Sequence, residues 1–316
     1  MRYRTRIAQN FHSSLMALIR DHSSEQKKTD VETSASQLDF ESITELSING
    51  HSHLMDALHL PFEIITDKEQ ASRVANYLMG LLMSKAKTIS RALNCLLLQK
   101  NVAGFTPLHQ ALKSGNVQNM QAYFTEVRVA VSNNLITQAE YKQLLIGATH
   151  AGFTPLHEAL ISGNAENMQA YFKEVREAVS NNLITQAEYK QLLIGANHAG
   201  FTPLHQAANS GSYPIYEAYM TALIPLGQYV MDEVLFSKTK AGHLPSCQCG
   251  KSDSAQINAA LNEIRSQFRP AADAVAQQRG YNDNHAKRAR SPRLFGGDRR
   301  LSEEQTGAPS HRSFRR

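Results

Sequence analysis

Residues 104–151 read GFTPLHQALKSGNVQNMQAYFTEVRVAVSNNLITQAEYKQLLIGATHA, and residues 152–199 repeat this stretch with seven substitutions in 48 positions. A third copy opens at residue 200 with GFTPLHQAANSG, and a degenerate copy opens at residue 49 with NGHSHLMDAL. Self-similarity at a fixed period indicates units that bury their apolar faces by stacking on their neighbours. The sequence therefore predicts one stacked array, with units near 49–103, 104–151, 152–199 and 200–241 and a decayed start at 242–268.

The beginning of each unit predicts a short helix. In the second copy, Thr154 is a good N-cap, Pro155 suits the first helical position because it lacks an N–H, and Gly163 can end the helix. A longer helix should follow and end near Asn181, because apolar residues recur there at the spacing of an amphipathic helix. These residues are Met168, Phe172, Val175 and Val179.

The last part of each unit predicts a third helix. Thr185 and Glu188 form a capping-box pattern, with the hydroxyl at the cap and the carboxylate reaching back from the third position. Thr137 and Glu140 repeat the pattern one unit earlier. Since every predicted element is a helix, the expected fold class is all-α.

The segments GFTPLHQAL, GFTPLHEAL and GFTPLHQAA resemble ankyrin repeats, whose hallmark is a TPLH tetrapeptide followed by a short helix. The period differs, because ankyrin repeats have about 33 residues and these units have 48. The resemblance implies an ankyrin-type helical repeat solenoid with extended repeats. It also implies that His109, His157 and His205 are hydrogen-bonding groups that tie neighbouring repeats together, not catalytic residues.

Ankyrin-repeat proteins usually bind other proteins through the turns between repeats and the exposed side of the first helices. Carried over to this chain, the resemblance implies a protein-binding scaffold whose partner contacts are Asn101, Val102, Gln110, Lys113, Thr149, His150, Glu158, Ile161, Asn197, His198, Gln206 and Asn209. Three of the seven substitutions between the duplicated units fall at these positions: Gln110/Glu158, Lys113/Ile161 and Thr149/Asn197. We therefore expect these side chains to face solvent.

The ends of the chain differ from the array in composition. Residues 1–48 are predicted to form an N-terminal cap, with helices over 5–19 and 36–46 and a polar linker over 22–36. Residues 270–316 hold 10 Lys and Arg against 5 Asp and Glu, and so carry the entire net charge of +5. Few of them are aliphatic or aromatic, which predicts a disordered basic tail.

The tail carries sequences typical of cellular addresses. Lys287, Arg288 and Arg290 resemble a minimal nuclear-import motif, which an import receptor would bind. The last residues resemble the C-terminal signals of bacterial type IV secretion substrates. Together with the near-identical duplication, they favour an effector secreted into a host cell, where it binds a host protein in the cytoplasm or nucleus. The alternatives are tail-mediated, sequence-independent nucleic-acid binding, a cytoplasmic protein, and mitochondrial targeting by the Arg-rich first 20 residues.

Motifs for enzymatic chemistry are absent from the sequence. It contains no phosphate-binding glycine loop, nucleophile elbow or HExxH motif, so we expect no enzyme, no cofactor and no small-molecule substrate. His243, Cys247 and Cys249 offer three soft ligands, but zinc sites use four and separate paired thiols by two to four residues, so no metal is expected. Cys95 is expected in the core, and no run of 18 uncharged apolar residues predicts membrane insertion.

Overall fold

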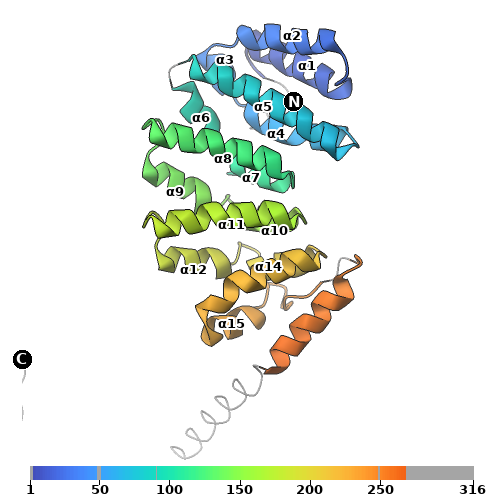
Figure 1. The fold of residues 1–316 in the computed structure, drawn as a ribbon, viewed down its shortest axis with the longest axis vertical. Helices are drawn as coiled ribbons and strands as arrows, with labels where there is room; N and C mark the ends of the chain where they lie inside the picture. Colours follow the sequence, from blue (N-terminus) through green and yellow to red (C-terminus); the bar gives the residue numbers. More distant parts are fainter. Residues whose placement is uncertain (1–2, 48–50, 90, 248–249, 268–316) are drawn as a thin grey trace, which may run out of the picture. The chain divides into compact units, whose positions relative to one another are not determined.

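The computed structural model describes residues 3–47, 51–89, 91–247 and 250–267, and every regular element within these ranges is a helix (Figure 1). The expected all-α class is confirmed. Residues 1–266 form one compact unit. The predicted tail over 270–316, including Lys287, Arg288 and Arg290, lies outside the described residues.

The two duplicated units fold into the same three helices, as predicted. The helices of residues 104–151 are α7 (Pro107–Lys113), α8 (Val117–Ser132) and α9 (Gln138–Ile146). Those of residues 152–199 are α10 (Pro155–Ile161), α11 (Ala165–Ser180) and α12 (Gln186–Ile194).

Local sequence rules account for the helix ends. Gly163 follows α10 with φ +75°, a conformation that glycine adopts at little cost. Asn182 follows α11 with φ +57°, and the Thr185–Glu188 capping box begins α12. The buried face of α11 includes Tyr171, which the apolar pattern did not single out, whereas Val179 is only half-buried.

The flanking units keep the order of helices with altered lengths. The first unit contains α4 (His53–Ile64), α5 (Lys68–Lys87) and α6 (Ala92–Leu98). The unit after the duplicated pair contains α13 (Pro203–Asn209), α14 (Tyr213–Leu223), the 3-10 turn η1 (Ile224–Leu226) and α15 (Gln228–Leu235). The decayed start lacks the short first helix, and residues 254–267 form its helix directly.

The N-terminal segment forms α1 (Arg6–Arg20), α2 (Glu25–Ser36) and α3 (Phe40–Thr44). The helix expected over 5–19 is confirmed, whereas the one expected over 36–46 is shorter and covers only residues 40–44. The linker expected over 22–36 is wrong for residues 25–36, because α2 packs against α1 and α5 and buries Val31 and Ala35. The apolar face of α1 is also buried, which explains its amphipathic pattern by packing alone.

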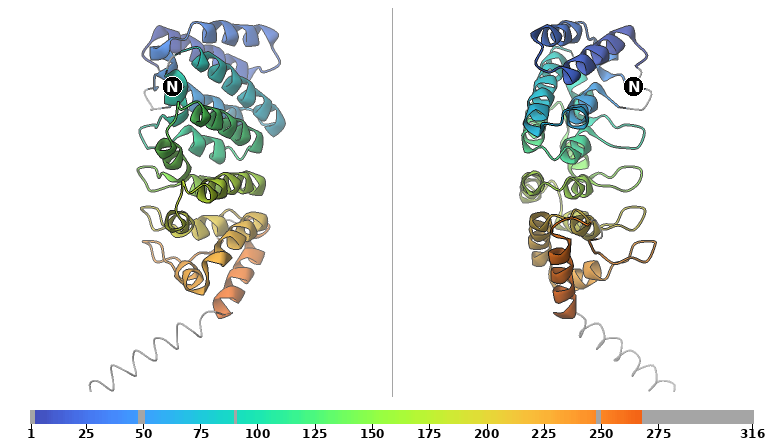
Figure 2. Two further views of the ribbon diagram at one scale, coloured as in Figure 1. Left: turned by 60° about the vertical axis from the view of Figure 1, so that its left-hand side comes forward. Right: turned by 90° about the vertical axis from the view of Figure 1, so that its right-hand side faces the viewer.

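Consecutive units stack through like elements. The first helices α4, α7, α10 and α13 contact one another in sequence, and the second helices α5, α8, α11 and α14 do the same. Figure 2 shows the resulting layers: second helices, first helices, and a row of loops that project beyond the first helices. No helix in the described part of the chain is both long and apolar enough to cross a membrane.

Candidate partner-binding surface

Each loop of the projecting row is a tight turn of five residues, which we call a finger. The described fingers are residues 101–105, 149–153, 197–201 and 239–243. In each of them the first residue donates its N–H to the carbonyl of the fifth, at 2.8–2.9 Å. The side chain of the first residue bonds to backbone N–H groups of the same finger: Asn101 Oδ1 accepts from Ala103 and Phe105, and Thr149 Oγ1 accepts from Phe153.

These capping bonds bury side chains that we expected to face solvent. Asn101, Thr149 and Asn197 are only 5–8% exposed. Asn and Thr side chains commonly close turns of this kind, so their spacing of 48 residues reflects the structure of the finger. The expectation of exposed side chains at these three positions is therefore wrong.

The second residue of each finger is exposed at its tip. These residues are Val102, His150, His198 and Lys240. Val102 is an apolar side chain with 71% of its surface accessible. The expected exposure is confirmed for Val102, His150 and His198.

Neighbouring fingers are joined backbone to backbone. His150 N donates to Ala103 O, and His198 N donates to Ala151 O, both at 3.0 Å. Glycine is required for this approach: Gly104 has φ +85°, and a Cβ there would lie 2.8 Å from His150 N. The finger tips are therefore held in a fixed row, one per unit.

A second row of predicted residues lies on the first helices, and we call it the inner-helix stripe. It consists of the fourth and seventh residue after each N-cap. The predicted members are Gln110, Lys113, Glu158, Ile161, Gln206 and Asn209, and the first unit adds Asp56 and His59, which were not predicted. Residues three apart lie on one face of a helix, and the four helices contact one another in order. The structure thus brings the predicted helix residues together along the stack.

Within the inner-helix stripe, exposure alternates. Lys113 and Asn209 are exposed, and Ile161 is 40% exposed. Gln110 and Glu158 are only 5% and 4% exposed, because each lies between neighbouring first helices. The expectation of solvent-facing side chains is wrong for these two residues.

Among the acids of this surface, Glu158 has the pKa that departs most from its ordinary value. Burial raises the pKa of its carboxyl to about 7, and the positive charge of Lys113 opposes the shift. No hydrogen bond or ion pair of this side chain is found among the described residues. The carboxyl is thus largely buried, and its nearest charge, on Lys113, lies beyond ion-pair distance.

The repeated histidines tie units together, as the resemblance implied. Thr154 N–H donates to His157 Nδ1 at 3.2 Å, which places the proton on Nε2, and Nε2 donates to Phe201 O of the next unit at 3.2 Å. His109 makes the same bonds to Thr106 and Phe153. Burial lowers the pKa of His109 and His157 to about 4, so both are neutral at pH 7.

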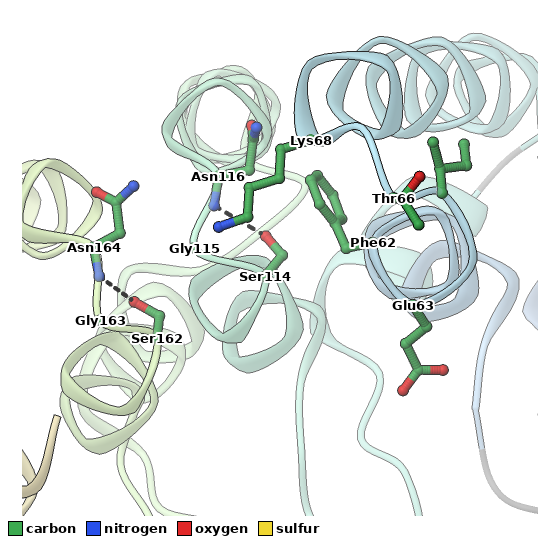
Figure 3. A pocket seen from close by; sticks show the side chains of 11 residues that line it. Phe62, Glu63, Thr66, Lys68, Ser114, Gly115, Asn116, Ser162, Gly163 and Asn164 are labelled. Carbon is green, nitrogen blue, oxygen red and sulfur yellow. Dashed lines mark hydrogen bonds between the residues drawn. The ribbon is translucent and has the colours of Figure 1, made fainter. Parts of the chain in front are cut away.

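A cavity of about 440 Å³ lies at the other end of the first helices, between the turns that lead to the second helices (Figure 3). Two identical Ser-Gly-Asn turns, 114–116 and 162–164, form one wall, and Phe62 and Lys68 reach it from the neighbouring unit. In each turn the Asn N–H donates to the Ser Oγ at 3.3 Å. None of the twelve predicted contact residues lines this cavity.

A polar cluster at the N-terminal end was not predicted from the sequence. Asp56 is fully buried and accepts a hydrogen bond of 2.8 Å from the Tyr3 hydroxyl, while His12 Nδ1 and His51 Nδ1 each lie 3.4 Å from its carboxylate. We call these four residues the Asp56 network. Burial alone would raise the pKa of Asp56, but the three neighbours outweigh it and lower the pKa to about 2.

Of the three soft ligands at 243–249, His243 and Cys247 are described by the structure, and Cys249 lies outside the described residues. Among the described side chains, no group of three or more metal-ligating residues could hold an ion. Cys247 is buried, and its backbone N–H donates to Asn258 Oδ1. Cys95 is half-buried, so its expected place in the core is only partly met.

The finger tips and the inner-helix stripe are therefore the surface on which the predicted residues converge. Of the twelve, Val102, Lys113, His150, Ile161, His198 and Asn209 are exposed on it, and Gln206 is half-buried. Comparison with known proteins adds no assignment: no protein-family model and no curated protein matches the chain.

Proposed function

We propose that residues 49–266 are an ankyrin-type helical repeat solenoid with extended units, and that the chain is a protein-binding scaffold. Its binding surface is the row of finger tips together with the inner-helix stripe. One observation carries the proposal. The side chains whose hydrogen bonds join the duplicated units are identical in both copies, whereas three of the seven substitutions fall on the fingers and the inner-helix stripe.

The geometry of this surface suits a protein partner. Each unit adds one finger tip and one stretch of the stripe, so the surface extends along the stack in a fixed register. A protein interface of ordinary size buries ~800 Å² on each partner. Apolar Val102 and Ile161 supply the exposed hydrophobic side chains that interfaces need near their centre.

Affinity capture with the full chain tests this proposal. A finger variant, Val102→Arg with His150→Glu and His198→Glu, should lose the proteins that the wild type retains. The matched control is Thr125→Lys with Val129→Glu on the outer helix α8, because the duplicated unit carries Lys173 and Glu177 at these positions. Equal capture by wild type, finger variant and control would exclude the finger surface as the binding site.

We further propose that the chain is a bacterial effector delivered into a host cell by type IV secretion. The support is the composition of its C-terminal residues and the near-identical duplication. A translocation reporter fused to the full chain should enter host cells, and one fused to a chain ending at Leu301 should not. Entry of both, or of neither, would refute delivery by a C-terminal signal.

A further inference from the structure

The four first helices carry different side chains at one equivalent position, four residues after the N-cap. The side chains are Asp56, Gln110, Glu158 and Gln206. Two are neutral amides and two are acids, and both acids are almost fully buried. Burying an ionised carboxylate costs folding free energy unless hydrogen-bond donors surround it. We therefore compare which residues supply donors to Asp56 and which could supply them to Glu158.

In the first unit, most of the donors come from outside the repeat. Tyr3 precedes α1 and His12 lies on α1, and both meet the Asp56 carboxylate. Among the described residues of the first unit, His51 is the side chain that also faces it. The first unit therefore shows what this position accepts: donor groups from a segment that packs onto the stack. There the segment belongs to the same chain.

In the third unit, no segment of the described chain supplies such a group. Glu158 is 4% exposed and has no hydrogen bond or ion pair among the described residues. The Oε1 atom of Gln110 is fully buried and accepts no hydrogen bond from the described residues. The carboxylate oxygens of Glu158 are not fully buried in this way, so solvent still reaches them. Lys113 is the cation that influences it, without approaching to ion-pair distance.

We propose that Glu158 receives one basic side chain, lysine or arginine, from the protein segment that binds the finger tips and the inner-helix stripe. The inference rests on the proposed function and names the chemistry of the partner. The basic side chain would give Glu158 the donor groups that Tyr3 and His12 give Asp56.

The surroundings of Glu158 fit a long basic side chain. Ile161 lies one turn further along α10 and is 40% exposed, so it offers an apolar surface to an aliphatic stem. A carboxylate in a desolvated site forms strong, charge-assisted bonds with an ammonium or guanidinium group. The pKa of about 7 adds support, because ionisation of this carboxyl is unfavourable until a cation arrives.

A random peptide library displayed on phage, selected against the full chain, provides the probe. Peptides that compete with one another and fail to bind the finger variant should share a lysine or arginine. Alanine at that residue should weaken binding at least tenfold, and Glu158→Gln should weaken it by a similar factor. The two changes combined should weaken binding little more than either alone, because they remove the same contact.

The duplicated unit provides the controls. Glu158→Gln installs the residue found at Gln110, and Glu166→Gln installs the residue found at Gln118, so both remove one negative charge from the same unit with side chains the fold already uses. Glu166→Gln should leave binding within twofold of wild type. Unchanged binding by Glu158→Gln, or selected peptides without a shared basic residue, would overturn the inference and leave the proposed function intact. If every selected peptide binds the finger variant as tightly as the wild type, the proposed function itself is contradicted, whatever Glu158→Gln does.

Discussion

The joint between the two duplicated units and the contact between the first unit and α1 use different chemistry for the same task. Between the duplicated units, neutral donors meet backbone carbonyls: His109 donates to Phe153 O, Asn167 to Leu112 O, and Tyr171 to Leu145 O. Where the first unit meets Tyr3 and His12 of the N-terminal segment, the polar contacts converge on one ionised side chain, Asp56.

The difference follows from what each contact must join. A carbonyl of the next unit is present at every internal joint, so the same donors can be used each time. The N-terminal helices are not a repeat. Carbonyls of α3 also accept from the first unit, Ser42 O from His53 and Thr44 O from Gln99, but the contact with Tyr3 and α1 uses a buried carboxylate, which accepts donors from several directions. Internal joints therefore need an identical sequence, whereas the end needs a particular set of side chains.

Acidification should have the largest effect, because the internal joints require neutral histidine. Burial holds the pKa of His109 and His157 at about 4 in the folded chain, and likewise that of His53, whose Nε2 lies 3.2 Å from Ser42 O at the N-terminal end. The pKa of a histidine in the unfolded chain is about 6.5. The unfolded state therefore takes up protons first, and stability present above pH 6.5 is lost as the pH falls towards 4. Each histidine should remove about 2–3 kcal/mol by pH 4.5.

Glu158 acts in the opposite direction, since its pKa is raised to about 7 and stability returns as it is protonated between pH 7 and 4.5. The net loss from pH 7 to 4.5 should be on the order of 5 kcal/mol. Urea unfolding at a series of pH values measures it. A free energy of unfolding that stays constant or rises between pH 6.5 and 4.5 would contradict the role of the neutral histidines.

Asp56→Ala should have the next largest effect, about 3 kcal/mol, because it removes the acceptor of the 2.8 Å bond from the Tyr3 hydroxyl and the carboxylate that His12 and His51 face. Gln110→Ala, at the equivalent position of the next unit, should cost about 1 kcal/mol. Urea unfolding gives both values, and hydrogen exchange should show α1 opening first in the Asp56 variant. Equal losses of unfolding free energy in the two variants would show that the Asp56 network stabilises the chain no more than the side chain at the equivalent internal position.

His157→Leu should cost about 2 kcal/mol, because it removes one of the two donors to the Phe201 carbonyl, leaving only the Asn197 N–H, and removes the acceptor for the Thr154 N–H. His198→Leu, at an exposed finger tip, should change stability by less than about 0.5 kcal/mol. Thermal or urea unfolding compares the two. A similar loss in both variants would mean that His157 does not hold the joint.

Glu158→Gln differs from the other changes in sign, because it should stabilise the chain. It replaces a buried acid by the amide found at Gln110, and the gain should be about 3 kcal/mol at pH 8 and near zero at pH 4.5, where the acid is already neutral. Paired unfolding curves at the two pH values test this. A loss of stability at pH 8 would show that Glu158 has a stabilising partner in the free protein.

The sequence predicted the elements whose signals are local. Caps such as Thr154 and Thr185, the glycine after each first helix and the apolar spacing of the second helix lie within a few residues of what they determine. Helix α2 was missed because it buries little more than Val31 and Ala35, too few residues for a clear amphipathic pattern. Its helical state depends on packing against α1 and α5.

The candidate site was predicted in outline and missed in detail. The rows of residues were placed correctly, but polar residues in turns were expected to be exposed, and Asn101 and Thr149 instead close their own fingers. The Asp56 network joins Tyr3 and His12 to residues more than 40 positions away. Nothing in local spacing indicates such a contact, although an acid at the position of Gln110 was a visible departure from the repeat.

The finger row has a consequence for how the gene can change. The bond from His150 N to Ala103 O and the bond from His198 N to Ala151 O use equivalent atoms, so the joint before a unit matches the joint after it. A 48-residue copy can be inserted or removed between the duplicated units without altering α1 or the final helix. Recombination between the two copies would then lengthen or shorten the surface by one finger at a time, a change in reach that needs no new side chain.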